Sequence, residues 1–145
     1  MRDYPTTILP CPLGCVNAVM QALDLDAERV VENVEAANLI AFDISAKNSR
    51  CKDLRVLARS VEHLRETGRP LVMEWPEIFR LLVPPGQLFV RGTEIARSLN
   101  CSRVHVENLI LAKLLQPSKE SRQGRGNSAI VPRSSYENFL IGRLQ

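Results

Sequence analysis

The sequence predicts a mainly α-helical α+β protein, with two similar modules in tandem that each carry a small β-hairpin. Three observations support this fold class. Apolar residues recur at one spacing in both halves, both halves show the same succession of helix, strand and turn signals, and a stretch rich in proline and apolar residues separates them. We expect a first module over residues 1–70, a short helical connector over 71–86 and a second module over 87–145.

The repeat is visible in apolar positions that lie 76 residues apart. The matching pairs are Leu23 and Leu99, Val30 and Val106, Val34 and Ile110, Ala36 and Ala112, and Leu39 and Leu115. Further on, residues 58–60 resemble residues 132–134 at an offset of 74, a slip of two residues that a hairpin loop would absorb. The order of these positions favours a duplicated module.

Two short helices joined by a tight turn are expected near the start of the second module. Thr93 is a suitable N-cap for a helix through Leu99. Asn100 and Cys101 would form the turn, and Ser102 would cap a second helix over residues 103–112. The inward face of this second helix would consist of Val106, Leu109 and Ile110. This arrangement is a helix-turn-helix unit.

A hairpin and a last helix are predicted to complete the second module. Residues 114–116 could form a strand, residues 117–127 an exposed loop, and residues 129–131 the returning strand. Pro132 would stop that strand, and the spacing of Ser134 and Glu137 predicts a capping box that opens a helix through Leu140. Helix, turn, helix, hairpin and helix make up a winged helix-turn-helix module.

The first module follows the same order. Asn17 would cap a helix through residue 23, and Asp26 a helix over 27–37. Strands are expected over 39–44 and 54–57 around a polar loop over 45–53, and Ser60 would begin a helix through residue 65. In the connector, Pro76 would open a short apolar helix that packs against both modules.

The segment over residues 93–106 is similar to the opening of excisionase-type and MerR-type winged helix-turn-helix domains. Residues 110–115 and 130–134 resemble the exit of that family's DNA-reading helix and its second wing strand. The family usually has glycine where this chain has Lys113 and, in the first half, Ala37. The resemblance covers residues 92–140 closely and 16–65 loosely. It implies double-stranded DNA binding in transcription regulation, recombination of phage or mobile elements, or DNA packaging, and it includes no catalytic signature.

The charge distribution indicates which half would meet a polyanion. Residues 1–75 hold nine Lys/Arg and eleven Asp/Glu, whereas residues 76–145 hold ten and five. The N-terminal residues of a reading helix face base edges in the major groove. The candidates are Ser102, Arg103, His105 and Asn108, since Arg can read guanine and Asn adenine. The alternative is that Ser102 is only a cap and Arg103 only a solvated charge.

The predicted wings supply the remaining candidates for contact with the DNA backbone. In the second module they are Lys119, Arg122 and Arg125 in the loop and Arg133 beside the last helix. In the first module they are Lys47, Arg50, Lys52 and Arg55. The second helix of that module is acidic, with Asp26, Glu28, Glu32 and Glu35 against Arg29 alone, and is therefore a poor DNA reader. The first module would grip DNA through its wing, which we favour, or bind a protein.

Other classes of protein are less consistent with the residues. Cys11 and Cys15 lie close together, but the other two cysteines and both histidines are isolated. A zinc site usually needs two close pairs, so we expect neither a metal nor a cofactor. We expect Cys101 to line the core and the chain not to be an enzyme. No apolar run approaches the ~20 residues of a membrane span and no secretion signal is evident, so we expect a cytoplasmic, or nucleoid-associated, monomer or weak homodimer. The main rival function is a protein-interaction adaptor.

Overall fold

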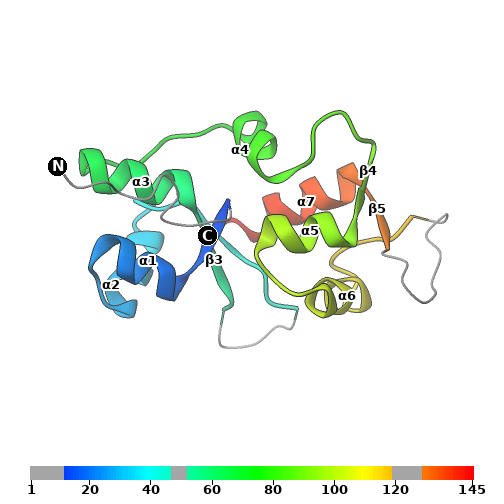
Figure 1. Cartoon of the computed structure of the whole chain (residues 1–145), viewed down its shortest axis with the longest axis horizontal. Helices are drawn as coiled ribbons and strands as arrows, with labels where there is room; N and C mark the ends of the chain where they lie inside the picture. The colour runs from blue at the N-terminus through cyan, green and yellow to red at the C-terminus, as the bar shows by residue number, and fades with distance from the viewer. Residues whose placement is uncertain (1–11, 47–51, 119–128) are drawn as a thin grey trace.

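Helices and two small antiparallel sheets make up the chain in the computed structural model, which describes residues 12–46, 52–118 and 129–145 (Figure 1). The seven helices in these ranges are short, and the strands have three or four residues each. The α+β class predicted from the sequence is confirmed. None of the described helices has the length and apolar character needed to cross a membrane.

The two halves present their elements in nearly the same order. The first half contains β1 (Leu13–Cys15), α1 (Val16–Leu23), α2 (Ala27–Glu35), β2 (Ala41–Asp43), β3 (Leu54–Leu57) and α3 (Ala58–Thr67). The connecting helix is α4 (Trp75–Leu82). The second half contains β4 (Phe89–Arg91), α5 (Gly92–Leu99), α6 (Arg103–Leu111), β5 (Ile130–Pro132) and α7 (Arg133–Arg143). In Figure 1 the two halves lie side by side, with α4 along one edge.

The turn between the two helices is repeated in detail at the 76-residue spacing. Asp24 and Asn100 end α1 and α5 with the same left-handed φ of 54°, which their short polar side chains tolerate better than most. Asp26 then caps α2 by accepting a backbone hydrogen bond at 2.8 Å, and Ser102 caps α6 in the same way at 3.0 Å. Both predicted caps are confirmed.

The exit from the second helix is also repeated, without glycine. Ala37 has a φ of 62° and Lys113 a φ of 63°. The backbone N–H of Ala37 donates to Val34 O at 3.1 Å, and that of Lys113 donates to Ile110 O at 3.0 Å. A left-handed conformation at a residue with a Cβ is strained by ~1–2 kcal/mol. Ala37 and Lys113 therefore both adopt a conformation that favours glycine.

Each helix pair is preceded by a strand that the sequence analysis missed. β1 pairs with β3, and β4 pairs with β5, both antiparallel. Each strand leads directly into a helix, so α1 starts at Val16 and α5 at Gly92. The predictions that Asn17 and Thr93 are N-caps are therefore wrong. At the start of α5, the N–H of Arg91 instead donates to the Glu94 carboxylate at 3.0 Å.

The last helix of each half begins earlier than predicted, because strand pairing sets its start. α3 starts at Ala58 and α7 at Arg133, and neither has a side-chain cap, so the capping box at Ser134 and Glu137 is wrong. Ser60 and Ser135 instead accept the backbone N–H of Ile40 and Gln116, at 3.1 and 2.9 Å.

These equivalent serines lie 75 residues apart, so the slip in the repeat is one residue rather than two. The segment over residues 114–116, predicted to be a strand, forms none and is held by the hydrogen bond to Ser135. The two halves thus share this hydrogen bond from a backbone N–H to a serine of the last helix.

Two apolar clusters form the core, and the first-half sheet, in the order β1-β3-β2, separates them. One cluster lies within the first half and consists of Val19, Val30, Val34, Leu39, Ala41, Val56, Ala58 and Val61. The other joins the opposite face of that sheet to the second half and to α4. Its first-half members are Leu13, Phe42, Ile44 and Leu57, and those from the α4 region are Ile78, Leu82 and Val83.

The connector and the C-terminal residues hold the halves together. The Trp75 and Phe42 ring centroids are 6.3 Å apart, and the expectation that the connector packs against both halves is confirmed by the shared cluster. After α7, Leu144 forms an isolated antiparallel bridge with Phe42, and the N–H of Gln145 donates to Ala41 O at 2.9 Å. The end of the chain thus extends the sheet of the first half.

Candidate nucleic-acid interface

The leading end of α6 is exposed, while its inner face is buried. Val106 and Leu109 are 2% and 0% exposed and fix the helix against the core. Ser102, Arg103 and Val104 at its start are exposed. In Figure 1, α6 lies at the lower edge of the molecule, on the side remote from α4. The first turn of α6 can therefore meet a macromolecule without rearrangement of the core.

Of the predicted site residues, Ser102 and Arg103 lie at the exposed start of α6, and Asn108 lies in its second turn. Arg103 and Asn108 are exposed and, within the part of the chain that the structure describes, their side chains have no hydrogen bond or ion pair. Ser102 is exposed, and its Oγ already accepts the backbone N–H of His105. Ser102 therefore positions the helix, whereas Arg103 and Asn108 offer polar groups that a ligand could bind.

His105 faces the first half instead of solvent. Its side chain is half-buried, and Nε2 lies 2.5 Å from Ile44 O. A backbone carbonyl only accepts hydrogen bonds, so Nε2 must carry a proton and donate. This bond fixes the first turn of α6 against the segment that follows β2. His105 is engaged in packing between the halves and is not displayed to a ligand.

Arg55 is a second link between the halves, at the turn before α6. Its side chain is 15% exposed, and its Nε donates to Asn100 O at 3.1 Å. Its Nη1 donates to Asp53 Oδ1 at 2.6 Å and to Leu54 O at 3.2 Å. The planar guanidinium can hold all three acceptors at once. Predicted as a wing contact to DNA, Arg55 instead anchors the turn between α5 and α6.

Two further predicted residues also have internal partners. Arg133 pairs with Glu137 at 3.1 Å, and its Nη1 donates to Pro84 O at 2.7 Å. Arg133 therefore ties the start of α7 to the chain before β4. Lys52 is exposed, and its Nζ donates to Gln145 Oε1 at 2.6 Å. The remaining candidates, Lys47, Arg50, Lys119, Arg122 and Arg125, lie outside the described residues.

Asp43 stabilises the contact between the halves electrostatically. It is 9% exposed, and its Oδ1 accepts the backbone N–H groups of Ser45 and Asp53 at 3.0 and 3.1 Å. Its Oδ2 lies 3.7 Å from Arg143 Nη1. Burial by itself would raise the pKa of Asp43, but the hydrogen bonds from Ser45 and Asp53 and the charge of Arg143 together hold it below its ordinary value. The carboxylate is therefore ionised at neutral pH.

The outer faces of α2 and α6 differ in chemistry at equivalent positions. On α2 the exposed face presents Glu28, Glu32 and Glu35. The residues 76 positions later are Val104, Asn108 and Leu111. Val104 is 62% exposed and Leu111 78% exposed. Neither apolar residue was predicted as a site residue, although the helical period places both opposite Val106 and Leu109.

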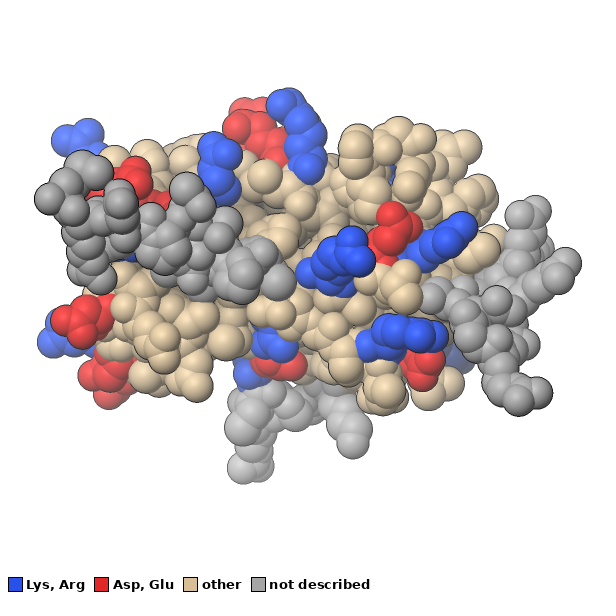
Figure 2. Space-filling view, in the orientation of Figure 1, with Lys and Arg blue, Asp and Glu red and all other residues tan. Residues whose placement is uncertain are grey.

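Charged side chains around α6 are mixed in sign. Arg97 on α5 and Lys113 after α6 are exposed, as are Arg103 and the acidic Glu107 on α6 itself. Figure 2 shows basic and acidic side chains next to one another over the half that contains α5 and α6. This face is therefore not a uniform basic patch, and recognition there would depend on individual side chains.

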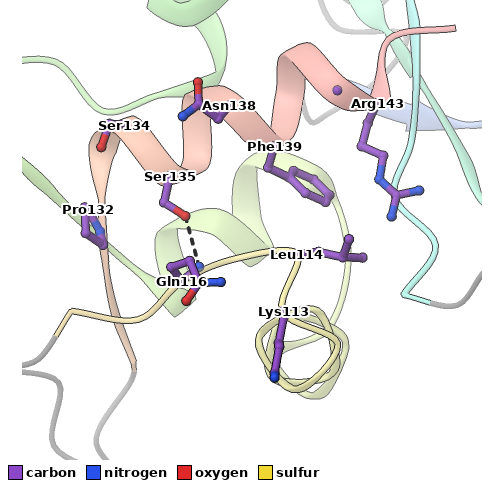
Figure 3. Close-up of a pocket in the computed structure, with 10 residues that line it drawn as sticks. Lys113, Leu114, Gln116, Pro132, Ser134, Ser135, Asn138, Phe139 and Arg143 are labelled. Atoms are coloured by element: carbon purple, nitrogen blue, oxygen red, sulfur yellow. Dashed lines mark hydrogen bonds between the residues drawn. The ribbon is translucent and has the colours of Figure 1, made fainter.

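An open groove of about 680 Å³ lies between α7 and the segment that follows α6 (Figure 3). Ser135 points from α7 to Gln116, whose backbone it holds, and Phe139 points toward Leu114. Lys113 and Arg143 contribute cationic side chains to the lining. The hydrogen bond from Gln116 N to Ser135 Oγ holds the segment after α6 against α7.

The described residues include the half-buried Cys101 and side chains of the types that can bind a metal ion. Cys101 packs against the core as predicted, and burial raises the pKa of its thiol to about 11. At neutral pH it is therefore protonated and weakly nucleophilic. Among the residues that the structure describes, no three His, Cys, Asp or Glu side chains are grouped to hold a metal ion.

Comparisons of the chain with protein-family models, with curated proteins and with solved structures find no match.

Proposed function

We propose that this chain is a double-stranded DNA-binding protein built from two winged helix-turn-helix modules, with α6 as the helix that enters the major groove. The observation that carries the proposal is the exposed outer surface of α6, where Arg103 at its start and Asn108 in its second turn have no partner among the described residues. Arginine can bind guanine and asparagine adenine through paired hydrogen bonds. The cap at Ser102 and the buried Val106 and Leu109 would hold these groups in place.

The repeated architecture supports the same proposal. Each half has two helices joined by a tight turn and a last helix that follows directly on a strand, β3 in the first half and β5 in the second. Two short helices joined by a tight turn are the helix-turn-helix unit on which the proposed modules are based. Transcription regulation, control of recombination and DNA architecture are the roles that the family resemblance implies for such a protein.

The first half would position α6 and would not read DNA through α2. Arg55 bonds to the turn before α6, and Ile44 accepts from His105 within its first turn. The exposed glutamates of α2 would be repelled by phosphates. This role differs from the wing contact expected from the sequence for Arg55, which has internal partners. Lys47 and Arg50 remain candidates for contact with the DNA backbone.

One observation favours the rival function of a protein-interaction adaptor. Val104 and Leu111 expose apolar surface on the same face of α6, and exposed apolar surface is a feature of protein-binding sites when it is extensive. In the adaptor, these residues would contact another protein and the basic groups would be incidental.

The test is a binding titration of a labelled random-sequence DNA duplex at low and moderate salt, with Arg103→Ala as the main variant. Affinity should fall steeply as salt rises, because phosphate contacts release counterions. Arg103→Ala should weaken binding to selected sites by about ten- to a hundredfold. The matched control is Arg59→Ala, on the exposed surface of α3, and it should bind as the wild type does. Absence of duplex binding at low salt would exclude the proposal and favour the adaptor.

A further inference from the structure

Val104, Asn108 and Leu111 lie on one face of α6. Successive spacings of four and three residues place side chains above one another on a helix. The buried Val106 and Leu109 point the opposite way, so this face is directed to solvent. Val104 is in the first turn, and Leu111 is the last residue of the helix. The apolar side chain of Val104 thus lies one turn before the exposed amide of Asn108 on the outer face of α6.

The chemistry of this face matches one particular base pair. In the major groove, thymine alone among the four bases displays a methyl group, and adenine presents the donor and acceptor pair that an asparagine amide can bind. The exposed polar and charged groups around Val104, which are Arg103, Asn108 and Glu107, suit a duplex read by individual side chains better than an apolar protein groove. Leu111 is less well placed to meet bases, because the N-terminal part of a reading helix contacts base edges.

We infer that Val104 contacts the methyl group of a thymine and Asn108 an adenine, so that α6 selects A·T pairs within its site. This inference rests on the proposed function and specifies which bases the helix reads. It also accounts for an apolar side chain that is 62% exposed at the start of α6. The equivalent position in α2 holds Glu28, which cannot make this contact.

The test uses a duplex selected from a random pool by the wild-type protein, and the same duplex with deoxyuridine in place of thymidine. The two differ only in the thymine methyl groups. Wild-type affinity should fall about fourfold for each methyl that is contacted, from the free energy of burying one methyl. Val104→Ala should bind the thymine duplex more weakly, and deoxyuridine should then cause little further loss, which closes a double-mutant cycle.

Val72→Ala is the matched control, since Val72 is 86% exposed and lies outside α6. It should keep the full sensitivity of the wild type to deoxyuridine. If the wild type binds both duplexes equally, or if Val104→Ala remains as sensitive as the wild type, the inference is overturned while the proposed DNA-binding function stands. If no duplex is bound at all, both are overturned, and Val104 would be assigned to a protein contact.

Discussion

Replacement of Arg55 by alanine should test how the first half holds the reading helix. The side chain is largely buried and donates to a carbonyl in the second half, to one in its own strand and to the carboxylate of Asp53. The ion pair contributes little because Asp53 is 42% exposed. A hydrogen bond from a charged donor contributes ~1.5–3 kcal/mol to stability. The bond to Asn100 O therefore accounts for most of the expected loss. We expect Arg55→Ala to lower the free energy of unfolding by about 2 kcal/mol.

Urea unfolding measures this change, because the midpoint shifts in proportion to the free energy. Arg55→Lys should recover only part of the loss, since an ammonium group lacks the planar fork that reaches all three acceptors. Arg59→Ala, at an exposed position of α3, is the control and should change stability by less than about 0.5 kcal/mol.

The same variants also test whether Arg55 positions α6 for DNA binding. If Arg55 positions the turn before α6, Arg55→Ala should also weaken binding to a selected duplex under conditions where the variant is folded. Equal urea midpoints for Arg55→Ala and Arg59→Ala would refute the reasoning, because the contact between the halves would then contribute nothing measurable.

Three further predictions concern strain, thiol reactivity and pH. Ala37→Gly and Lys113→Gly should each raise the free energy of unfolding by up to about 1 kcal/mol, because glycine adopts a positive φ without strain. A lower urea midpoint for either variant would contradict this. With its pKa raised to about 11, Cys101 should react with a thiol reagent near pH 8 far more slowly than a free cysteine does, as mass spectrometry of the labelled peptide can show. Because the pKa of Asp43 is lowered in the folded chain, its contribution to stability is full above its unfolded pKa of 3.8 and is lost as pH falls through the lower folded value. Asp43→Asn lacks this titrating carboxylate, so its free energy of unfolding should fall less steeply than that of the wild type between about pH 5 and about pH 2. Acid unfolding curves measure this, and parallel curves for the two proteins would contradict the prediction.

Local sequence determined the helix pairs and their caps. The helical period of Val106 and Leu109 and the caps at Asp26 and Ser102 are each contained within one short segment. Such signals act between residues three or four positions apart, so they can be recognised before the fold is known. The exposure of Val104 belongs to this group too, since it follows from the same helical period.

Tertiary structure alone decided the strands and the roles of several charged residues. β1 and β4 exist because they pair with β3 and β5, some 40 residues along the chain, and these pairings set where the last helices begin. Arg55 and His105 are suited by type to bind DNA, yet each bonds to a carbonyl of the opposite half. Their partners lie 45 and 61 positions away, and no local pattern encodes which distant backbone group will be brought within hydrogen-bonding distance.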